Sequence, residues 1–354
     1  MNKKMTFYYR FTIMLCMTVS SLGCGTIRYL FQAGRGQLEL SNRSKPIANV
    51  IKDEYTDPDT KKLLSQVENI KKFGETYGLK PTKNYTEYVK LDRPYAVWVV
   101  SACEVLKFRS KEWAFPFFGS FTYLGWFNKE NAENFAEELK KEGWDVNVRG
   151  AGAYSTIGWF RDAVLSSMFA HVKTDSAYGA LANVVLHEST HATLYLNDQA
   201  YFNESLASFV ADYLTPTYLE KFFGKTSKEY NSYKESEVVG GRTNKVFLEA
   251  YSELQKLYQT SLSEDIKLRK KQEILKNAQD QLGLKKEINN ATLVQYRTYG
   301  VGQEEFSRIL KSCEFNWQRF WQVMRKIQSG SFGKKHEENL GSVLLSFIEG
   351  SGCH

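Results

Sequence analysis

The stretch VVLHESTHATL, residues 184–194, carries the pattern His-Glu-x-x-His inside an apolar helix that we predict over residues 175–196. His187 and His191 are four residues apart, so on a helix they point the same way, about 6 Å apart along the axis, and both imidazoles can reach one metal ion. Glu188 lies one position round the helix, where its carboxylate can hold a water molecule on the metal and accept its proton. The spacing therefore predicts a catalytic site for one zinc ion.

A catalytic zinc ion normally takes a third protein ligand, and Glu204 in the sequence FNESLA, residues 202–207, is the candidate. The first helix continues about five residues, or about 7.5 Å, beyond His191 before a turn at residues 197–198. A second helix, predicted over residues 202–214, returns Glu204 to the two histidines if it packs antiparallel at the usual separation of about 8 to 10 Å.

Two other acidic residues are alternatives for the third ligand. Asp198 lies in the turn between the helices, too far along the chain, and Asp212 lies two turns beyond Glu204. The three remaining histidines are isolated in the sequence and are interpreted as structural or surface residues: His171, His336 and His354.

The sequence around this helix pair predicts an α+β fold with a small mixed sheet. Segments rich in aromatic and β-branched residues, or with alternating apolar residues, predict strands at residues 95–103, 113–127 and 144–148, with a helix at 131–141. Pro216 is expected to end the second helix of the pair. Residues 217–284 are charged and indicate a helical hairpin, followed by a last helical segment that includes Trp317 and Trp321.

These patterns divide the 354 residues into four segments. They are a signal peptide (1–23), an N-terminal helical segment (24–90), an α+β catalytic core (91–216) and a C-terminal helical region packing on that core (217–354). A length of this size permits about two domains, but the pattern favours one catalytic unit with helical additions.

Residues 1–23 have the features of an export signal: a basic start, then an apolar run from about residue 11 to residue 22 without charge. That run is shorter than the roughly 20 residues of a membrane-spanning helix. Leu22, Gly23 and Cys24 resemble a bacterial lipobox, in which the cysteine becomes the first mature residue and carries lipid. We therefore expect a protein anchored by lipid at Cys24, on the periplasmic side of a bacterial membrane or at the cell surface. An ordinary cleaved signal with a chance cysteine is the alternative.

Charge and cysteine content exclude several classes of protein. Three of the 47 Lys and Arg residues lie in the first 23 residues, which leaves 44 against 40 Asp and Glu, without a basic run of the kind that binds nucleic acid. If Cys24 carries lipid, the mature thiols are Cys103, Cys313 and Cys353, so one disulfide at most can form. No clustered cysteine pattern of a zinc finger or thioredoxin is present.

The chain resembles the bacterial putative zinc aminopeptidases, exported or lipid-anchored proteins related in motif to the gluzincin metallopeptidases. The matching stretches run in order through nearly the whole mature chain: Cys24 with residues 29–33 and 36–38, residues 91–94, 114–116 and 153–160, the HExxH helix, residues 202–205, residues 289–291, Trp317 and Phe320. The resemblance implies a zincin-like core, His187, His191 and Glu204 as zinc ligands, and Glu188 as catalytic base.

Three residues, at two places in the chain, depart from the pattern of these families. Ser189 and Thr190 stand within HExxH where an apolar pair is usual, and they could bend or hydrate the helix without touching the metal. Ser208 stands four residues after Glu204, where many gluzincins have an Asp that supports a metal-binding His. Another acid or a backbone carbonyl would have to take that role.

The aromatic segment at residues 153–160 suggests a place for substrate. It could be an edge strand to which a peptide adds, with Tyr154 near the reacting carbonyl as the oxyanion donor. A core strand and turn is an equally good interpretation of the same residues. Tyr296 and Tyr299 are rival donors, interpreted as core residues.

The sequence thus favours a membrane-anchored zinc peptidase acting on peptides, with an aminopeptidase reaction implied by the resemblance alone. The alternatives are a zinc endopeptidase, a lipid-anchored binding or assembly protein that retains the zinc fold without turnover, and an esterase using the same site. The sequence does not specify the oligomeric state.

Overall fold

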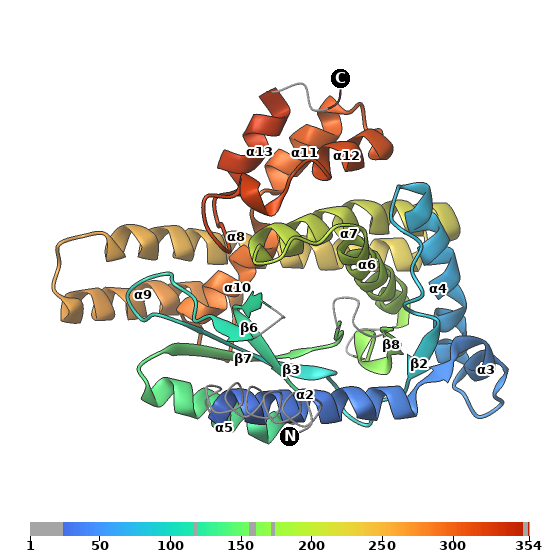
Figure 1. The fold of residues 1–354 in the computed structure, drawn as a ribbon, viewed down its shortest axis with the longest axis horizontal. Helices are drawn as coiled ribbons and strands as arrows, with labels where there is room; N and C mark the ends of the chain where they lie inside the picture. Colours follow the sequence, from blue (N-terminus) through green and yellow to red (C-terminus); the bar gives the residue numbers. More distant parts are fainter. Residues whose placement is uncertain (1–23, 116–118, 156–160, 171–173, 350–352, 354) are drawn as a thin grey trace, which may run out of the picture.

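The computed structural model describes residues 24–115, 119–155, 161–170, 174–349 and 353 (Figure 1). Most of these residues are helical. The helices are α2 (Cys24–Arg43), α3 (Ile47–Lys52), α4 (Pro58–Thr76), α5 (Lys129–Lys141), α6 (Thr174–Thr193), α7 (Ala200–Phe223), α8 (Lys228–Tyr258), α9 (Glu264–Leu282), α10 (Asn290–Gly300), α11 (Gln303–Ser312), α12 (Trp317–Met324) and α13 (Leu340–Glu349).

The strands are short and form small sheets, as an α+β fold requires. They are β1 (Lys45–Pro46), β2 (Glu87–Val89), β3 (Val97–Cys103), β4 (Trp113–Phe115), β5 (Gly119–Phe121), β6 (Tyr123–Trp126), β7 (Asp145–Ala151) and β8 (Val164–Leu165). One sheet has the order β6-β3-β7 with both pairs antiparallel, and another has the order β1-β2-β8 with one antiparallel and one parallel pair. Strands β4 and β5 form a separate antiparallel pair.

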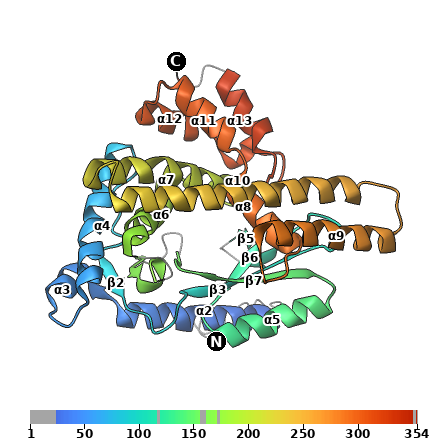
Figure 2. The same ribbon diagram turned by 180° about the vertical axis from the view of Figure 1, so that it is seen from behind.

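The β6-β3-β7 sheet has a helical layer on each face. Helices α2 and α5 lie along one face, and α10 with the α6, α7 and α8 layer lies over the other (Figure 1, Figure 2). Successive side chains of β3 alternate between these layers: Val97 and Val99 enter the large core, while Val100 and Ala102 enter a smaller core under α5. Because its side chains alternate between the two faces of the sheet, β3 packs against both helical layers.

Helices α6 and α7 are the centre of the large core. Both are apolar nearly all round, as expected of buried helices, and they pack against each other and against α4 and α8. Leu181, Val185, Leu206 and Val210 are fully buried. The antiparallel pair predicted around the HExxH sequence is therefore present.

Several predicted boundaries differ from the structure. Helix α7 does not end at Pro216 but continues through it to Phe223, because buried residues beyond the proline, such as Tyr218, hold the second half in place. The segment predicted to be of strand type at residues 113–127 contains three short strands in its described part, β4, β5 and β6. The N-terminal segment is mainly helical as far as Thr76, with the short strand β1 between α2 and α3, and then forms strand β2 where a helix was expected.

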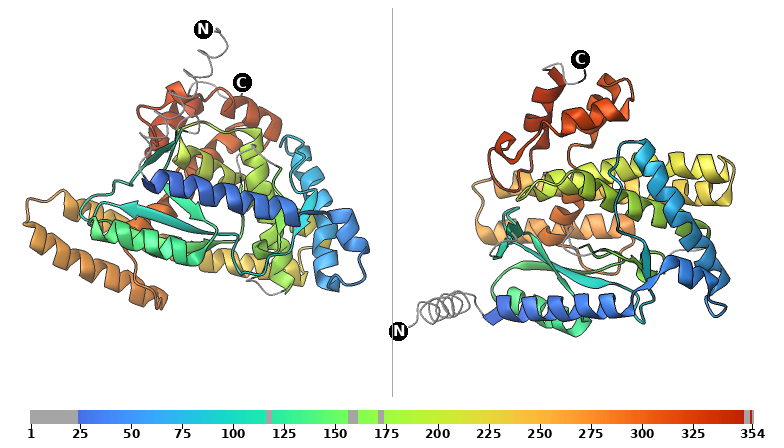
Figure 3. Two further views of the ribbon diagram at one scale, coloured as in Figure 1. Left: turned by 60° about the horizontal axis from the view of Figure 1, so that its bottom comes forward. Right: turned by 45° about the vertical axis from the view of Figure 1, so that its right-hand side comes forward.

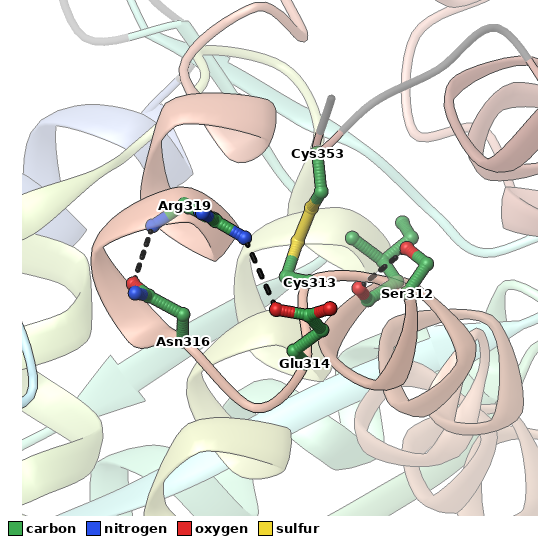
Figure 4. Close-up of a disulfide and its surroundings, with 7 residues drawn as sticks. Ser312, Cys313, Glu314, Asn316, Arg319 and Cys353 are labelled. Carbon is green, nitrogen blue, oxygen red and sulfur yellow. Dashed lines mark hydrogen bonds and ion pairs between the residues drawn. A yellow bond between two sulfur atoms is a disulfide. The ribbon is translucent and has the colours of Figure 1, made fainter.

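Helices α11, α12 and α13 form a group on the side of α7 away from the sheet (Figure 3). A disulfide between Cys313 and Cys353 closes this group (Figure 4), with a Cα–Cα distance of 5.0 Å. Cys103 is a buried free thiol whose pKa burial raises to about 12. The limit of one disulfide among these three cysteines, expected from their odd number, is confirmed.

Helices α8 and α9 form the predicted charged hairpin, which projects beyond the sheet (Figure 1). A buried ion pair fastens it to β7: Lys271 Nζ lies 2.5 Å from Asp145 Oδ2, and it also donates to the carbonyl of Val105 at 2.9 Å. The same carboxylate oxygen accepts the backbone N–H of Asn290 at the start of α10. Within the described residues, no helix combines the length and apolar composition needed to cross a bilayer.

We predict that Lys271→Met lowers the free energy of unfolding by about 3–5 kcal/mol, because it leaves the Asp145 carboxylate buried without its cation. Chemical denaturation followed by circular dichroism measures this change.

Lys276→Met on the same helix is the matched control. Lys276 forms an exposed pair with Asp280, so its loss is expected to cost only about 0.3–0.5 kcal/mol. Equal effects of the two substitutions would contradict a structural role for the buried pair.

Candidate metal centre

Three potential metal ligands converge between α6 and α7. His187 Nε2 lies 3.3 Å and His191 Nε2 lies 3.7 Å from the same carboxylate oxygen, Oε2 of Glu204. One ligand atom from each of the three residues lies within 4.8 Å of the others. The side chains are between 11% and 16% exposed, so the cluster lies at the boundary of the core.

The polar residues inside the HExxH sequence turn into the helix rather than toward this cluster. Ser189 Oγ donates to the carbonyl of Val185, and Thr190 Oγ1 donates to that of Leu186, each four residues back. Both side chains are buried. Ser189 and Thr190 therefore do not contact the three potential ligands, as the sequence allowed. Their hydroxyl groups bond to carbonyls of the same helix rather than to water.

The turn between the helices is fixed by Asn203, the residue before Glu204. Its side chain accepts the backbone N–H of Leu196 at 2.9 Å and donates to the carbonyl of the same residue at 2.7 Å. Ser205, the residue after Glu204, donates to the carbonyl of Thr298 on α10. Glu204 is therefore held between two hydrogen-bonded neighbours, which fix its position on α7 relative to the two histidines of α6.

A loop at residues 334–337 holds the outside of the same turn. The backbone N–H of His336 donates to the carbonyl of Asp198 at 2.7 Å, and Lys335 pairs with the Asp198 carboxylate at 2.8 Å. Gln199 donates to the carbonyl of Lys334. His336 is buried, so its interpretation as a structural residue is confirmed, and burial lowers its pKa.

Electrostatics favour an ionised carboxylate in the cluster. Burial by itself would raise the pKa of Glu204, but hydrogen bonds from His187 and His191 outweigh it and hold that pKa well below its usual range. Burial likewise opposes the charged form of His191, yet the hydrogen bond and charge of Glu204 leave its pKa raised. The carboxylate therefore carries its charge inside the protein, where it needs a cation beside it.

Two tyrosines from outside the helix pair flank Glu204. Tyr123 of β6 donates its hydroxyl to Glu204 Oε1 at 3.3 Å, and the charge of Glu204, with burial, raises the pKa of Tyr123. Tyr299 of α10 lies with its ring 6.3 Å from the His187 ring, and burial and the charge of Glu204 raise its pKa. Both phenols are therefore neutral donors at neutral pH.

Two buried polar atoms beside the cluster have no hydrogen-bond partner among the described residues: Glu188 Oε2 and His191 Nδ1. Buried polar groups are nearly always paired, so an unpaired carboxylate oxygen next to a ligand cluster indicates a place for water or substrate. Glu188 is not one of the three converging ligands. The charge of Glu188 nevertheless acts on the cluster, since it contributes to the raised pKa of His191.

The three residues fit a divalent metal ion. Two neutral imidazoles and one carboxylate are a zinc donor set, and ligands at about 2.0–2.2 Å from a tetrahedral ion lie about 3.3–3.6 Å apart. The separations of Glu204 Oε2 from the two histidine nitrogens, 3.3 and 3.7 Å, are close to that value. The cluster could therefore hold one ion with little movement of the side chains.

The two alternative acids lie outside the cluster. Asp198 is engaged by Lys335 and by Ser120, whose backbone N–H and hydroxyl both lie 3.1 Å from its carboxylate. Asp212 accepts a hydrogen bond from Asn183, one turn before His187 on α6. The charge of His187 acts on the Asp212 carboxyl, so Asp212 is a candidate for the supporting role left open by Ser208.

The tyrosines named from the sequence occupy different environments. The ring of Tyr154 packs edge-on against Phe127 at 4.9 Å, and none of its described contacts involves the three ligands or Glu188. Residues 156–160 of its segment lie outside the described residues. Tyr296 packs on Phe247. Tyr299 is not merely a core residue, as first interpreted, because α10 crosses the sheet beside the cluster and brings the ring next to His187.

A family model described as putative aminopeptidase matches residues 28–340. The chain belongs to the putative aminopeptidase family. The expected resemblance is thereby confirmed, and membership of the aminopeptidase family indicates peptidase activity. Searches among curated proteins and among solved structures find no match.

Sequence reasoning missed two of the aromatic neighbours of the cluster. Tyr195 lies four residues after His191, and the two rings are 5.9 Å apart, so the helical spacing was a usable signal. Burial and the charge of Glu204 raise the pKa of Tyr195 to about 12. Tyr123 gave no such signal, since its approach depends on the pairing of β6 with β3.

We predict that Tyr123→Phe lowers metal affinity about 10–100-fold, because it removes the hydrogen bond that orients the Glu204 carboxylate. Competition with a fluorescent zinc chelator measures this affinity. Glu204→Ala, which removes the ligand, should reduce binding further.

Tyr296→Phe removes the same hydroxyl from a tyrosine of α10 that packs on Phe247. This control is expected to bind metal like the unmodified protein. A Tyr123→Phe protein with unchanged affinity would contradict the orienting role of Tyr123.

Proposed function

We propose that this member of the aminopeptidase family is a zinc-dependent peptidase, with His187, His191 and Glu204 as the ligands of one zinc ion and Glu188 as the general base. One observation carries the proposal: two imidazole nitrogens and a buried carboxylate oxygen converge beside a second, unpaired carboxylate. Family membership supports the peptidase reaction. Bound zinc would supply Lewis acidity to water and to the scissile carbonyl.

Glu188 is the proton carrier in this proposal. Its Oε2 is buried and has no hydrogen-bond partner among the described residues, so it is free to accept a proton from the attacking water. The same atom then delivers the proton to the departing amine. A carboxylate in a partly desolvated site suits both steps because it is not already paired with a lysine or arginine.

Tyr299 is the best placed oxyanion donor. Arg149 Nη2 donates toward the Tyr299 hydroxyl at 3.5 Å, which leaves the phenolic proton available for a substrate oxygen. The raised pKa keeps that proton in place at neutral pH. We propose Tyr299 for the role first considered for Tyr154, while Tyr123 orients Glu204. One such donor typically contributes about 10²–10³-fold to the rate.

The position of the cleaved bond has two candidates. An aminopeptidase needs an acidic group for the substrate α-amine, but Glu188 and Glu204 both have other roles, and the described cluster contains no further carboxylate. This observation favours an endopeptidase as the second candidate beside the aminopeptidase reaction.

Membrane attachment is a further part of the proposal. Helix α2 begins at Cys24, and its outward face carries Phe31 and Leu38, which are 75% and 64% exposed, with Arg35 between them. Apolar side chains with interspersed basic residues are typical of helices that lie on a membrane surface. A lipid on Cys24 would place this face against the bilayer.

We predict that Glu188→Gln retains zinc but loses hydrolysis by about 10²–10⁴-fold, because an amide cannot accept the proton. Metal content by emission spectroscopy and hydrolysis of a peptide panel by mass spectrometry measure the two properties.

Glu249→Gln, on the exposed side of α8, is the control and should keep both the bound zinc and the hydrolysis of peptides. Full activity in the Glu188→Gln protein would overturn the mechanism. The same panel with free and N-acetylated peptides separates the two candidate reactions, since only an endopeptidase cuts both forms equally fast.

We predict that Cys24→Ser releases the protein from the membrane fraction of expressing cells, because the lipid attachment point is lost. Cell fractionation with detection of the protein in each fraction is the measurement. Cys16→Ser, which removes a thiol from the signal segment, is the control and should leave attachment intact. A Cys24→Ser protein that still sediments with membranes would refute lipid attachment at this residue.

A further inference from the structure

A pocket lies between the β6-β3-β7 sheet and helix α10, directly beside the ligand cluster. Its polar lining residues include Tyr123, Arg149, Gln295 and Tyr299. Arg149 pairs in register with Val99, and Tyr123 pairs with Ser101, so these side chains share the face of the sheet that looks toward α10. The alternation of the strands therefore aims Arg149 into the pocket.

The guanidinium of Arg149 is poorly satisfied. Nη2 makes one long hydrogen bond, 3.5 Å to the Tyr299 hydroxyl, and Nε is buried without a partner among the described residues. An arginine has five N–H donors in a fork suited to a carboxylate, and a partly buried cation without an anion is costly. The arrangement leaves a cationic binding group unused.

No ion pair joins Arg149 to a carboxylate among the described side chains. Arg93 and Arg297 also have unpaired buried nitrogens, but each has a carboxylate: Glu39 at 2.8 Å and Glu338 at 3.8 Å. Arg149 therefore differs from Arg93 and Arg297, because it has no carboxylate partner among the described side chains.

The surroundings of Arg149 add positive charge. Lys286 donates to the Asn147 side chain at 2.8 Å and to the carbonyl of Val148 at 2.6 Å, both in β7, and neither acceptor is charged. Burial and the charges of Lys140 and Arg149 lower the pKa of Lys286. The field along this part of β7 thus favours an anion.

The pocket adjoins the proposed reaction centre through two side chains. Tyr299 touches Arg149 on one side and His187 on the other, and Tyr123 joins the pocket lining to Glu204. One peptide residue spans about 3.8 Å between Cα atoms. The Tyr299 hydroxyl lies 3.5 Å from Arg149 Nη2 and its ring lies 6.3 Å from the His187 ring, so about one tyrosine side chain separates the guanidinium from the cluster.

We propose that Arg149 binds a carboxylate of the peptide substrate on the leaving side of the scissile bond. This inference rests on the proposed peptidase function and adds the substrate class: short peptides with a free C-terminal carboxylate, or peptides with an acidic side chain at that position. The pocket selects substrates by a negative charge, while the ligand cluster performs the cleavage.

Three substrates of the zinc-loaded full chain test the inference: Ala-Ala, Ala-Ala-amide and Ala-Glu-amide. We expect KM for one or both of the carboxylate-bearing peptides to be about 10–100-fold lower than for Ala-Ala-amide, the range of a charge-assisted hydrogen bond. Preference for Ala-Ala identifies the C-terminal carboxylate, and preference for Ala-Glu-amide identifies the side chain. Equal KM values for all three peptides would overturn the inference.

Arg149→Gln should make KM for the carboxylate-bearing peptides nearly equal to KM for Ala-Ala-amide. Arg149→Lys should restore part of the preference for the carboxylate-bearing peptides. Lys286→Gln removes a neighbouring charge outside the pocket lining and should keep the preference. If Lys286→Gln abolishes it as fully as Arg149→Gln, the general field rather than Arg149 selects the substrate, and the inference fails. Retained zinc in each variant shows that the site is folded.

Calorimetric titration of zinc-loaded Glu188→Gln with the same three peptides separates this inference from the proposed function. If the unmodified protein cleaves no peptide, the proposed function fails. The pocket would still be supported if the Glu188→Gln protein bound a carboxylate-bearing peptide more tightly than Ala-Ala-amide and the double variant Glu188→Gln, Arg149→Gln did not. Cleavage without any preference for a carboxylate, in binding or in KM, would overturn the pocket and leave the peptidase function in place.

Discussion

The burial of one charged carboxylate governs the centre of this protein. Glu204 lies between α6 and α7 with most of its surface covered, and a charge in that position is stable only beside a compensating partner. His187 and His191 supply two partner atoms on the same oxygen, and a bound cation would supply the compensating charge. The apolar packing of the helix pair brings these groups together, but the charge on Glu204 decides what can be bound between them.

The remaining elements position this carboxylate and shape the space around it. Asn203 fixes the level of Glu204 by holding the chain at Leu196, and Tyr123 reaches the second carboxylate oxygen from the sheet. Helix α10 adds Tyr299 from the other side. The sheet thus has two functions, since its α5 face is packed with apolar side chains while its opposite face carries the polar residues beside the cluster. The alternation of side chains along each strand is sufficient to keep the apolar residues on one face and the polar residues on the other.

The helix pair and the convergence of His187, His191 and Glu204 followed from the sequence, because the spacing of these residues is local. His187 and His191 are separated by one helical turn, and Glu204 by a short turn whose length could be estimated. The contributions of Tyr123, Arg149 and Tyr299 could not be estimated in this way, because they depend on strand register and on how α10 crosses the sheet.

The helix boundaries show the same limit. Pro216 was expected to end α7, since proline removes one backbone donor and clashes with the preceding turn. Burial of Tyr218 and Leu219 beyond it outweighs that local cost, and the helix continues to Phe223. Similarly, residues 113–127 have the composition of strands, but the sequence does not indicate that their described part contains three separate strands, β4, β5 and β6. Tertiary packing decides both cases, and a single sequence does not reveal it.

The loop at residues 334–337 has a consequence for the order of events during synthesis. All three ligand side chains are present once α7 has left the ribosome, but the contacts of this loop with Asp198 and Gln199 form only after more than a hundred further residues have been added. The disulfide between Cys313 and Cys353 encloses the loop in a covalent ring whose last member lies next to the C-terminus. The nascent chain therefore carries the three side chains for more than a hundred residues of synthesis before the loop that fastens the turn between α6 and α7 is made.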